Sequence, residues 1–284
     1  MQLDYYGHHI GIIMPFIGIY LPKKQKRIFN NDAIFIKEKI MDVSLNKFIS
    51  DSGFCSRREA DKYIDECRVT INGQDADKGN RVRPGDIVKV DGEPLKKKTA
   101  AIYIMLYKPK GVTCTTDTKD KTNIIDYLNF KTRIFPIGRL DKLSEGLIFL
   151  TNDGDIVNKI LRAGNGHEKE YMVTTDKKFD HEFINAMRKG VRIINTTTKP
   201  CFVKQEGDMR FRIILTQGLN RQIRRMCEAL GYRVTSLKRV RIMNFTLKGI
   251  EPGRWRYFSP VEINMLSELL KNSSKTEGED GMGE

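Results

Sequence analysis

Several residue types and motifs that mark common chemistries are scarce or absent in this sequence. Its cysteines are widely spaced and include no C-x-x-C pair, which excludes a disulfide framework and the usual zinc patterns. We therefore expect reduced thiols, as in a cytoplasm, at Cys55, Cys67, Cys114, Cys201 and Cys227. The sequence also lacks a Walker loop and the motifs G-x-G-x-x-G, H-E-x-x-H and G-x-S-x-G. Their absence argues against the nucleotide, zinc-protease and serine-hydrolase sites that those motifs mark.

A long apolar run is missing as well. The run from Ile10 to Leu21 has twelve residues, too few to span a bilayer as a helix. No basic segment precedes it and no A-x-A site follows, as a signal peptide would require. The simplest interpretation is that residues 1–40 are an extension, with Met41 as the native start, so that residues 1–42 precede the fold. A peripheral membrane anchor in residues 1–40 is the alternative.

Positive charge is what the sequence has in excess. Its 284 residues include 50 Lys and Arg against 36 Asp and Glu, a formal net charge of +14. With 39% hydrophobic and 30% charged residues, the composition is typical of a folded, soluble protein. The charge predicts an acidic partner, most simply a nucleic acid, because Lys and Arg displace counterions from phosphates. An anionic membrane surface would attract the same charge, so the sign of the charge alone does not distinguish a nucleic acid from a membrane.

A small module is expected over residues 43–92. Ser56 and Glu59 form a capping-box pattern at the start of a helix, and Asn72-Gly73 indicates a hairpin turn. The helix carries Arg57, Arg58 and Lys62, although the module as a whole has no net charge. As charges alone, these three residues are more typical of a solvated face than of a binding site. Residues 93–101 are expected to form a linker.

The larger half, residues 102–271, alternates short strands with a few helices. Strands are predicted at 102–106, 135–137, 146–151, 170–174 and 211–215, and helices at 155–164, 183–187, 221–230 and 260–271. Strands outnumber helices and short turns join many of them. We therefore expect an α+β fold with a mixed, mainly antiparallel sheet and helices packed against it. Residues 272–284 are polar and are predicted to form a disordered tail.

Basic residues concentrate between Arg221 and Arg241. Seven of these twenty-one residues are Lys or Arg and one is acidic. Arg221, Arg224 and Arg225 have the i, i+3, i+4 spacing that places them on one side of a helix. Such an unbalanced set predicts an RNA phosphate as its counter-ion.

Several stretches resemble known families. The pattern "LNKFISDSGFCSRREADKYI…VTINGQ…VRPGDIV" resembles the S4 RNA-binding domain. Residues 135–155, "FPIGRLDKLSEGLIFLTNDGD", resemble the signature of the RNA pseudouridine synthases, whose G-R-L-D aspartate falls on Asp141. "LYKPKG" at 106–111, "KEY" at 169–171 and "LTQGLNRQIRRM" at 215–226 resemble further motifs of that family. An S4 domain ahead of them is the layout of the branch that modifies bacterial ribosomal RNA, and residues 157–171 are most similar to its F-type members.

The resemblance gives roles to residues that composition alone would leave as turn or surface residues. It implies that Asp141 is the catalytic carboxylate, acting on C1′ or on the C2′ proton, with Arg224 as its ion-pair partner and Tyr171 stacking on the uracil. The implied RNA contacts are Arg57, Arg58, Lys62, Lys108, Arg139, Arg221 and Arg225. The implied substrate is a uridine in 23S rRNA, with tRNA as a further candidate.

The resemblance also limits the partners. No cofactor or metal is implied, because the isomerisation is redox-neutral and needs no external group. We expect a cytoplasmic monomer that does not bind a membrane. Two alternatives remain at this point: a sibling synthase acting on another rRNA or tRNA uridine, and a non-catalytic S4-type ribosome assembly factor.

Overall fold

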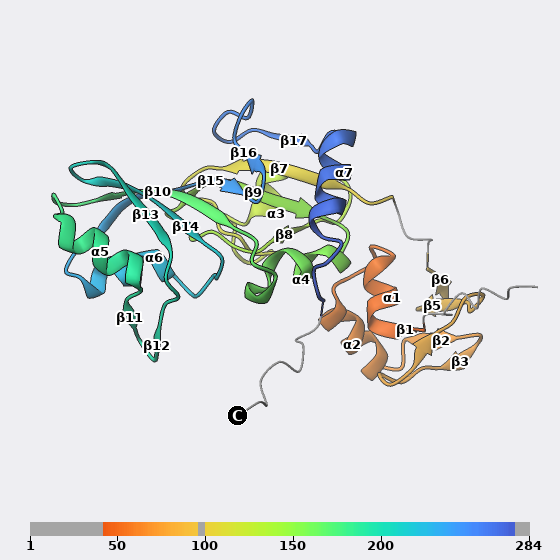
Figure 1. Ribbon diagram of the computed structural model, residues 1–284. Helices are drawn as coiled ribbons and strands as arrows, with labels where there is room; N and C mark the ends of the chain where they lie inside the picture. Colours follow the sequence, from red (N-terminus) through yellow and green to blue (C-terminus); the bar gives the residue numbers. More distant parts are fainter. Residues whose placement is uncertain (1–41, 96–99, 276–284) are drawn as a thin grey trace, which may run out of the picture. The chain divides into compact units, whose positions relative to one another are not determined.

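The computed structural model describes residues 42–95 and 100–275, and Figure 1 shows their arrangement. Three expectations therefore lie wholly or partly outside the described residues. These are the N-terminal extension with its candidate start at Met41, the centre of the linker at 96–99, and the tail at 276–284. Among the described residues, no helix is long and apolar enough to cross a membrane, and no group of three or more His, Cys, Asp or Glu could hold a metal ion.

The small module is a pair of helices packed on short strands. Its elements are α1 (Leu45–Asp51), α2 (Arg57–Asp65), β1 (Val43–Ser44), β2 (Val69–Ile71), β3 (Gln74–Asp75), β4 (Arg81–Val82), β5 (Val88–Val90) and β6 (Glu93–Pro94). The predicted capping box is present, because Ser56 accepts from the Glu59 amide and Glu59 accepts from the Ser56 amide. Asn72 and Gly73 both have positive φ and join β2 to β3, which confirms the predicted hairpin.

The larger part is built on a nine-stranded sheet with the order β13-β14-β10-β15-β9-β7-β17, in which β8 also pairs with β9 and β16 with β15. The strands are β7 (Tyr103–Lys108), β8 (Phe135–Ile137), β9 (Glu145–Thr151), β10 (Lys169–Thr175), β13 (Phe202–Gly207), β14 (Arg210–Leu215), β15 (Val234–Ile242), β16 (Phe245–Thr246) and β17 (Trp255–Tyr257). All its pairs are antiparallel except β15 with β9. This confirms the expected mixed, mainly antiparallel sheet.

The single parallel pair depends on a glycine. Gly146 of β9 lies opposite Arg239 of β15 and has φ +116°. A Cβ atom at Gly146 would lie 2.2 Å from the carbonyl oxygen of Arg239. The two backbones can therefore approach closely only because this residue has no side chain.

Helices cover both faces of the sheet over different strands. They are α3 (Ile124–Leu128), α4 (Asp155–Leu161), a 3₁₀ turn (Ala163–Asn165), α5 (His181–Lys189), α6 (Gln222–Ala229) and α7 (Pro260–Leu269), with a hairpin of β11 (Arg192–Ile193) and β12 (Thr196–Thr197). Helices α5 and α6 pack on the β13-β14-β10-β15 half, and α4 and α7 pack on β7 and β9. Helix α3 covers the other face of β7 and β9.

Three local features differ from the sequence predictions. The sequence predicts no strand after residue 230, but residues 234–242 form β15, the strand that joins the two halves of the sheet. Helix α4 ends at Leu161, three residues before the expected stop at Gly164. Ser274, expected in the tail, exchanges hydrogen bonds with Asn165. The five cysteines are free, as expected.

Candidate active site

Asp141 lies in the loop between β8 and β9. The loop leaves β8 through Gly138, which has φ +76°, and it closes when the Ser144 amide donates to the carbonyl oxygen of Asp141 over 2.9 Å. The buried side chain of Leu140 anchors the loop in the core next to the aspartate. The carboxylate itself remains one third exposed. The backbone is thus fixed while the carboxylate faces outward.

Arg224 of α6 is the nearest cation to this carboxylate. Its Nε lies 3.4 Å from Oδ2 of Asp141, and its side chain is only 9% exposed. Nη1 donates to the carbonyl oxygen of Val234 and Nη2 to the Ser144 hydroxyl, both over 3.1 Å. Because a buried guanidinium needs both a counter-charge and acceptors, these contacts hold Arg224 in place and direct its charge at Asp141.

The same carboxylate borders a small pocket. Tyr171 of β10 is half-buried, packs against two apolar clusters and lines this pocket. Arg221 is the residue just before α6, and its Nη1 lies 3.9 Å from Oδ2 of Asp141. The lining residues are Arg139, Leu140, Asp141, Ser144, Tyr171, Leu215, Gln217, Gly218, Leu219, Arg221, Gln222, Ile223 and Leu237.

This arrangement suits covalent or proton-transfer chemistry on a planar ligand. Asp141 has a guanidinium 3.4 Å away, and no described residue donates a hydrogen bond to its side chain. Its oxygens can therefore reach a ligand as nucleophile or base. The ring of Tyr171 offers a stacking surface on the wall of the same pocket.

Lys108 does not fit its predicted role as an RNA contact. Its side chain is fully buried, and its ammonium donates to the carbonyl oxygens of Pro109 (2.9 Å) and Val112 (2.8 Å). Burial lowers the pKa of Lys108, while the nearby Cys114 and Asp141 act in the opposite direction. Lys108 therefore stabilises the turn after β7 from inside the protein. The proline and glycine of "KPKG" suggested a loop, but they gave no sign that the lysine points inward.

The other predicted RNA contacts are distributed over several elements. Arg57, Arg58 and Lys62 are exposed on α2. Arg139 and Arg221 are exposed where they line the pocket. Arg225 is half-buried and lies outside the pocket lining.

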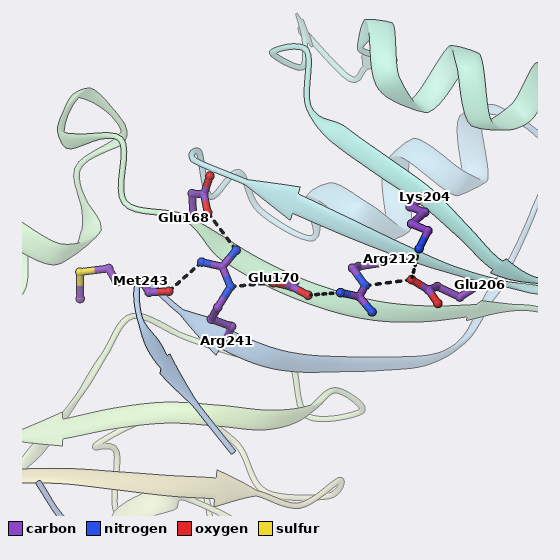
Figure 2. A network of polar contacts seen from close by, with 7 residues as sticks. All are labelled: Glu168, Glu170, Lys204, Glu206, Arg212, Arg241 and Met243. Atoms are coloured by element: carbon purple, nitrogen blue, oxygen red, sulfur yellow. Dashed lines mark hydrogen bonds and ion pairs between the residues drawn. The ribbon is translucent and has the colours of Figure 1, made fainter. Parts of the chain in front are cut away.

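Much of the predicted basic cluster has counter-ions within the protein. Arg233 pairs with Asp176. Arg241 pairs with Glu170 and Glu168, at one end of a row of alternating charges that crosses the strands (Figure 2). We call this row the ion-pair ladder; its members are Lys204, Glu206, Arg212, Glu170, Arg241 and Glu168. RNA phosphate is therefore not needed as a counter-ion for these arginines, because β10, β13 and neighbouring loops supply carboxylates.

Ser144 is a residue that the sequence analysis missed. It is fully buried and contacts both members of the central pair, through its amide to Asp141 and through its hydroxyl to Arg224. Ser144 lies three residues after Asp141 within the motif at 135–155, and this position is the signal in the sequence that could have pointed to it. Its role depends on Arg224, which is distant in sequence, so only the fold reveals it.

Comparisons with known proteins identify the family of this chain. The family described as "RNA pseudouridylate synthase" matches residues 102–229, and the "S4 domain" family matches residues 43–88. The chain is 56% identical to "Dual-specificity RNA pseudouridine synthase RluF" of Escherichia coli (strain K12), over 82% of this chain and 81% of that protein. It is 32% identical to "Ribosomal large subunit pseudouridine synthase B" of Bacillus subtilis (strain 168), over 79% and 96%.

A solved structure agrees as well. The crystal structure of a pseudouridylate synthase superposes with a TM-score of 0.58 at 28% identity, covering 79% of this chain and 99% of the other. The relatives span both the S4 module and the sheet domain, so the resemblance inferred from the motifs, including its F-type subgroup, is confirmed. The chain therefore belongs to the RNA pseudouridine synthase family and is an isomerase that converts uridine to pseudouridine in RNA.

Proposed function

We propose that the substrate of this enzyme is a specific uridine of 23S rRNA and that it also accepts a tRNA. The names of two relatives support this, one acting on the large ribosomal subunit and one having dual specificity. The observation that carries the catalytic part is the pairing of Asp141 with a buried arginine at the edge of a pocket that Tyr171 lines. The protein would act in the cytoplasm as a monomer.

The reaction assigns a task to each residue of the pocket. Breaking the N1–C1′ bond and forming the C5–C1′ bond requires access to a sugar that is hidden in stacked RNA, so the nucleotide must flip out, at a cost of a few kcal/mol. Asp141 then attacks C1′ or removes the C2′ proton, and Arg224, whose Nε lies 3.4 Å from Oδ2 of Asp141, orients the carboxylate. Tyr171 stacks on the flipped uracil and accepts the C5 proton late in the reaction. Arg139 fills the space that the base leaves.

RNA binding is shared between the two modules. Arg57, Arg58 and Lys62 project from α2 of the S4 module, where their exposed charges can meet phosphates. Arg221 and Arg225 perform the same task beside the pocket. The isomerisation is redox-neutral and transfers no external group, so it implies no cofactor.

The test is release of tritium from RNA labelled at uracil C5. The RNA comes from cells that lack this gene and is used as separate 23S rRNA and tRNA fractions. Tritium release reports the isomerisation itself, because C5 loses its hydrogen only when the glycosidic bond moves there. We expect release from both fractions by the wild type and none by Asp141→Asn, while Asp117→Asn, an exposed aspartate outside the pocket, serves as the matched control. Release from tRNA alone would overturn the rRNA assignment, and tight binding without release from either fraction would favour an assembly factor.

A further inference from the structure

Exposed aromatic side chains gather at one edge of the sheet. Tyr127, Trp255 and Tyr257 are 43%, 37% and 54% exposed, and they are three of the five exposed aromatic residues among the described residues. Phe130 lies beneath two of them, with its ring centroid 5.6 Å from that of Trp255 and 6.2 Å from that of Tyr257. We call these four residues the aromatic edge.

The aromatic edge is held rigidly. The rings of Phe130, Trp255 and Tyr257 meet edge to face. The hydroxyl of Tyr127 donates to the carbonyl oxygen of Gly253 over 3.0 Å, which ties α3 to the segment before β17. Strand β17 pairs with β7 on one side and ends the sheet on the other. The exposed rings are therefore presented in a fixed arrangement, which lowers the entropic cost of binding a ligand.

This edge lies on the same face of the sheet as the catalytic pocket. Trp255 and Tyr257 stand directly opposite Leu106 and Ile104 of β7. These two residues belong to the apolar layer that also holds Leu140 and packs against Tyr171. The order β10-β15-β9-β7-β17 places four strand spacings, about 19 Å, between Tyr171 and the edge.

Positive charge accompanies the rings. Lys131 follows Phe130 and Arg254 precedes Trp255, and both side chains are exposed. Within the described ranges 42–95 and 100–275 neither forms an ion pair, in contrast to Arg256, which is bound by Glu262. Exposed rings beside unpaired cations are the combination that proteins use for single-stranded nucleic acid, with bases on the rings and phosphates on the cations.

We propose that the aromatic edge is a second RNA contact, on which unpaired bases flanking the target uridine stack while Lys131 and Arg254 meet their phosphates. This inference rests on the proposed function and deepens it, because it requires a substrate with unpaired nucleotides a short reach from the flipped uridine. A protein partner is the alternative occupant, and the charge beside the rings favours RNA.

The sequence provides a direct reporter, because Trp255 is the chain's one tryptophan. Asp141→Asn protein, which we expect to bind without turnover, is titrated with a 23S rRNA transcript, and tryptophan emission is read beside filter binding. We expect quenching that saturates together with binding, and a fully paired RNA duplex should quench much less. Saturated binding of the transcript with unchanged emission would overturn the proposal.

Substitutions at Tyr257 test the energetic contribution. Tyr257→Leu keeps apolar area but removes the stacking surface, so we expect the Kd for the transcript to rise about five- to tenfold with an unchanged rate at saturating RNA. Tyr257→Phe should bind as the wild type does. Phe202→Ala is the matched control, because Phe202 is 53% exposed on β13 and points away from its buried neighbour Val203. Wild-type affinity in Tyr257→Leu, with native thermal stability, would assign the edge to another partner.

Tritium release from the same transcript separates the two proposals. If the wild type releases no tritium, the proposed function fails whatever the fluorescence shows. If the wild type releases tritium and Tyr257→Leu has an unchanged KM, the aromatic edge alone is misassigned.

Discussion

Two carboxylates of the sheet domain, one in the loop between β8 and β9 and one on β10, are held in different ways. Asp141, at the pocket, is one third exposed and has its arginines at 3.4 and 3.9 Å. Glu170, in the ion-pair ladder, is 12% exposed and accepts a 2.6 Å hydrogen bond from Arg241, with Arg212 at 3.3 Å on its other side (Figure 2). The ladder satisfies its own charges, whereas the Asp141 carboxylate keeps room for a ligand.

The cations differ as well. The ladder arginines have carboxylate partners, while several other buried cations of the sheet domain donate to main-chain carbonyl oxygens instead. These cations are Lys108, Lys169 and Arg239. Because carbonyl oxygens carry no full charge, they do not neutralise these cations, whose positive charge attracts an anionic substrate. The difference separates a structural network from a catalytic one.

The largest effect is expected where β9, which follows the Asp141 loop, pairs with β15, which carries Arg241 of the ion-pair ladder. Gly146→Ala places a Cβ atom 2.2 Å from the Arg239 carbonyl oxygen, so β9 and β15 must separate. We expect a loss of about 3 kcal/mol or more in the free energy of unfolding. Urea denaturation measures it, with Gly207→Ala, whose Cβ would meet only a side chain at 3.9 Å, as the control. Equal stability of the two variants would refute the close-approach explanation.

Exchanging arginine for lysine in each region should separate their functions. Arg224 and Arg241 each make three side-chain contacts, so the same substitution removes comparable interactions. We expect Arg224→Lys to lower kcat about 10²-fold. Arg241→Lys should keep the wild-type rate and lower only the Tm. Similar rate losses in both variants would contradict the distinction.

Ser144 should act through Arg224 rather than on the substrate. Ser144→Ala removes the acceptor of Nη2, and we expect kcat to fall about tenfold with little change in KM, because the guanidinium is then less well aimed. Ser144→Thr keeps the hydroxyl and should restore most of the rate. Steady-state kinetics on the same RNA measures both, and a failure of threonine to restore activity in a folded protein would argue against a positioning role.

The smallest effect concerns Lys169. Burial lowers its pKa to about 8, so between pH 8 and 10.5 the unfolded chain holds a proton that the native state has lost. Stability therefore rises with pH in that window, by about 1.4 kcal/mol per unit from this group. In Lys169→Met this contribution is absent, so the wild type should gain stability relative to the variant from pH 8 to pH 9. If the difference in unfolding free energy between the wild type and Lys169→Met did not change with pH, this would contradict the lowered pKa of Lys169.

Local signals predicted the elements that depend on neighbouring residues. The capping box at Ser56 and the turn at Asn72-Gly73 could be predicted because their partners lie within three residues. Strand β15 was missed because its alternation is hidden by charged side chains whose partners lie on other strands.

The sequence predicted those site residues that lie in the family motifs. The motifs named Asp141, Arg224 and Tyr171; in the structure Asp141 and Tyr171 line one pocket, and Arg224 forms an ion pair with Asp141. They could not show that Lys108 points inward or that Ser144 joins the aspartate to the arginine, because both facts depend on long-range packing.

The most direct test applies one chemical change to both carboxylates. Asp141→Asn and Glu170→Gln each replace a carboxylate by an amide of the same shape, and single-turnover tritium release from 23S rRNA is measured for both with saturating enzyme. We predict a loss of at least about 10³-fold for Asp141→Asn. Glu170→Gln should release tritium within about twofold of the wild type and show a lower Tm, since it weakens contacts to Arg241 and Arg212. Appreciable turnover by Asp141→Asn, or an equal loss in Glu170→Gln, would contradict the account.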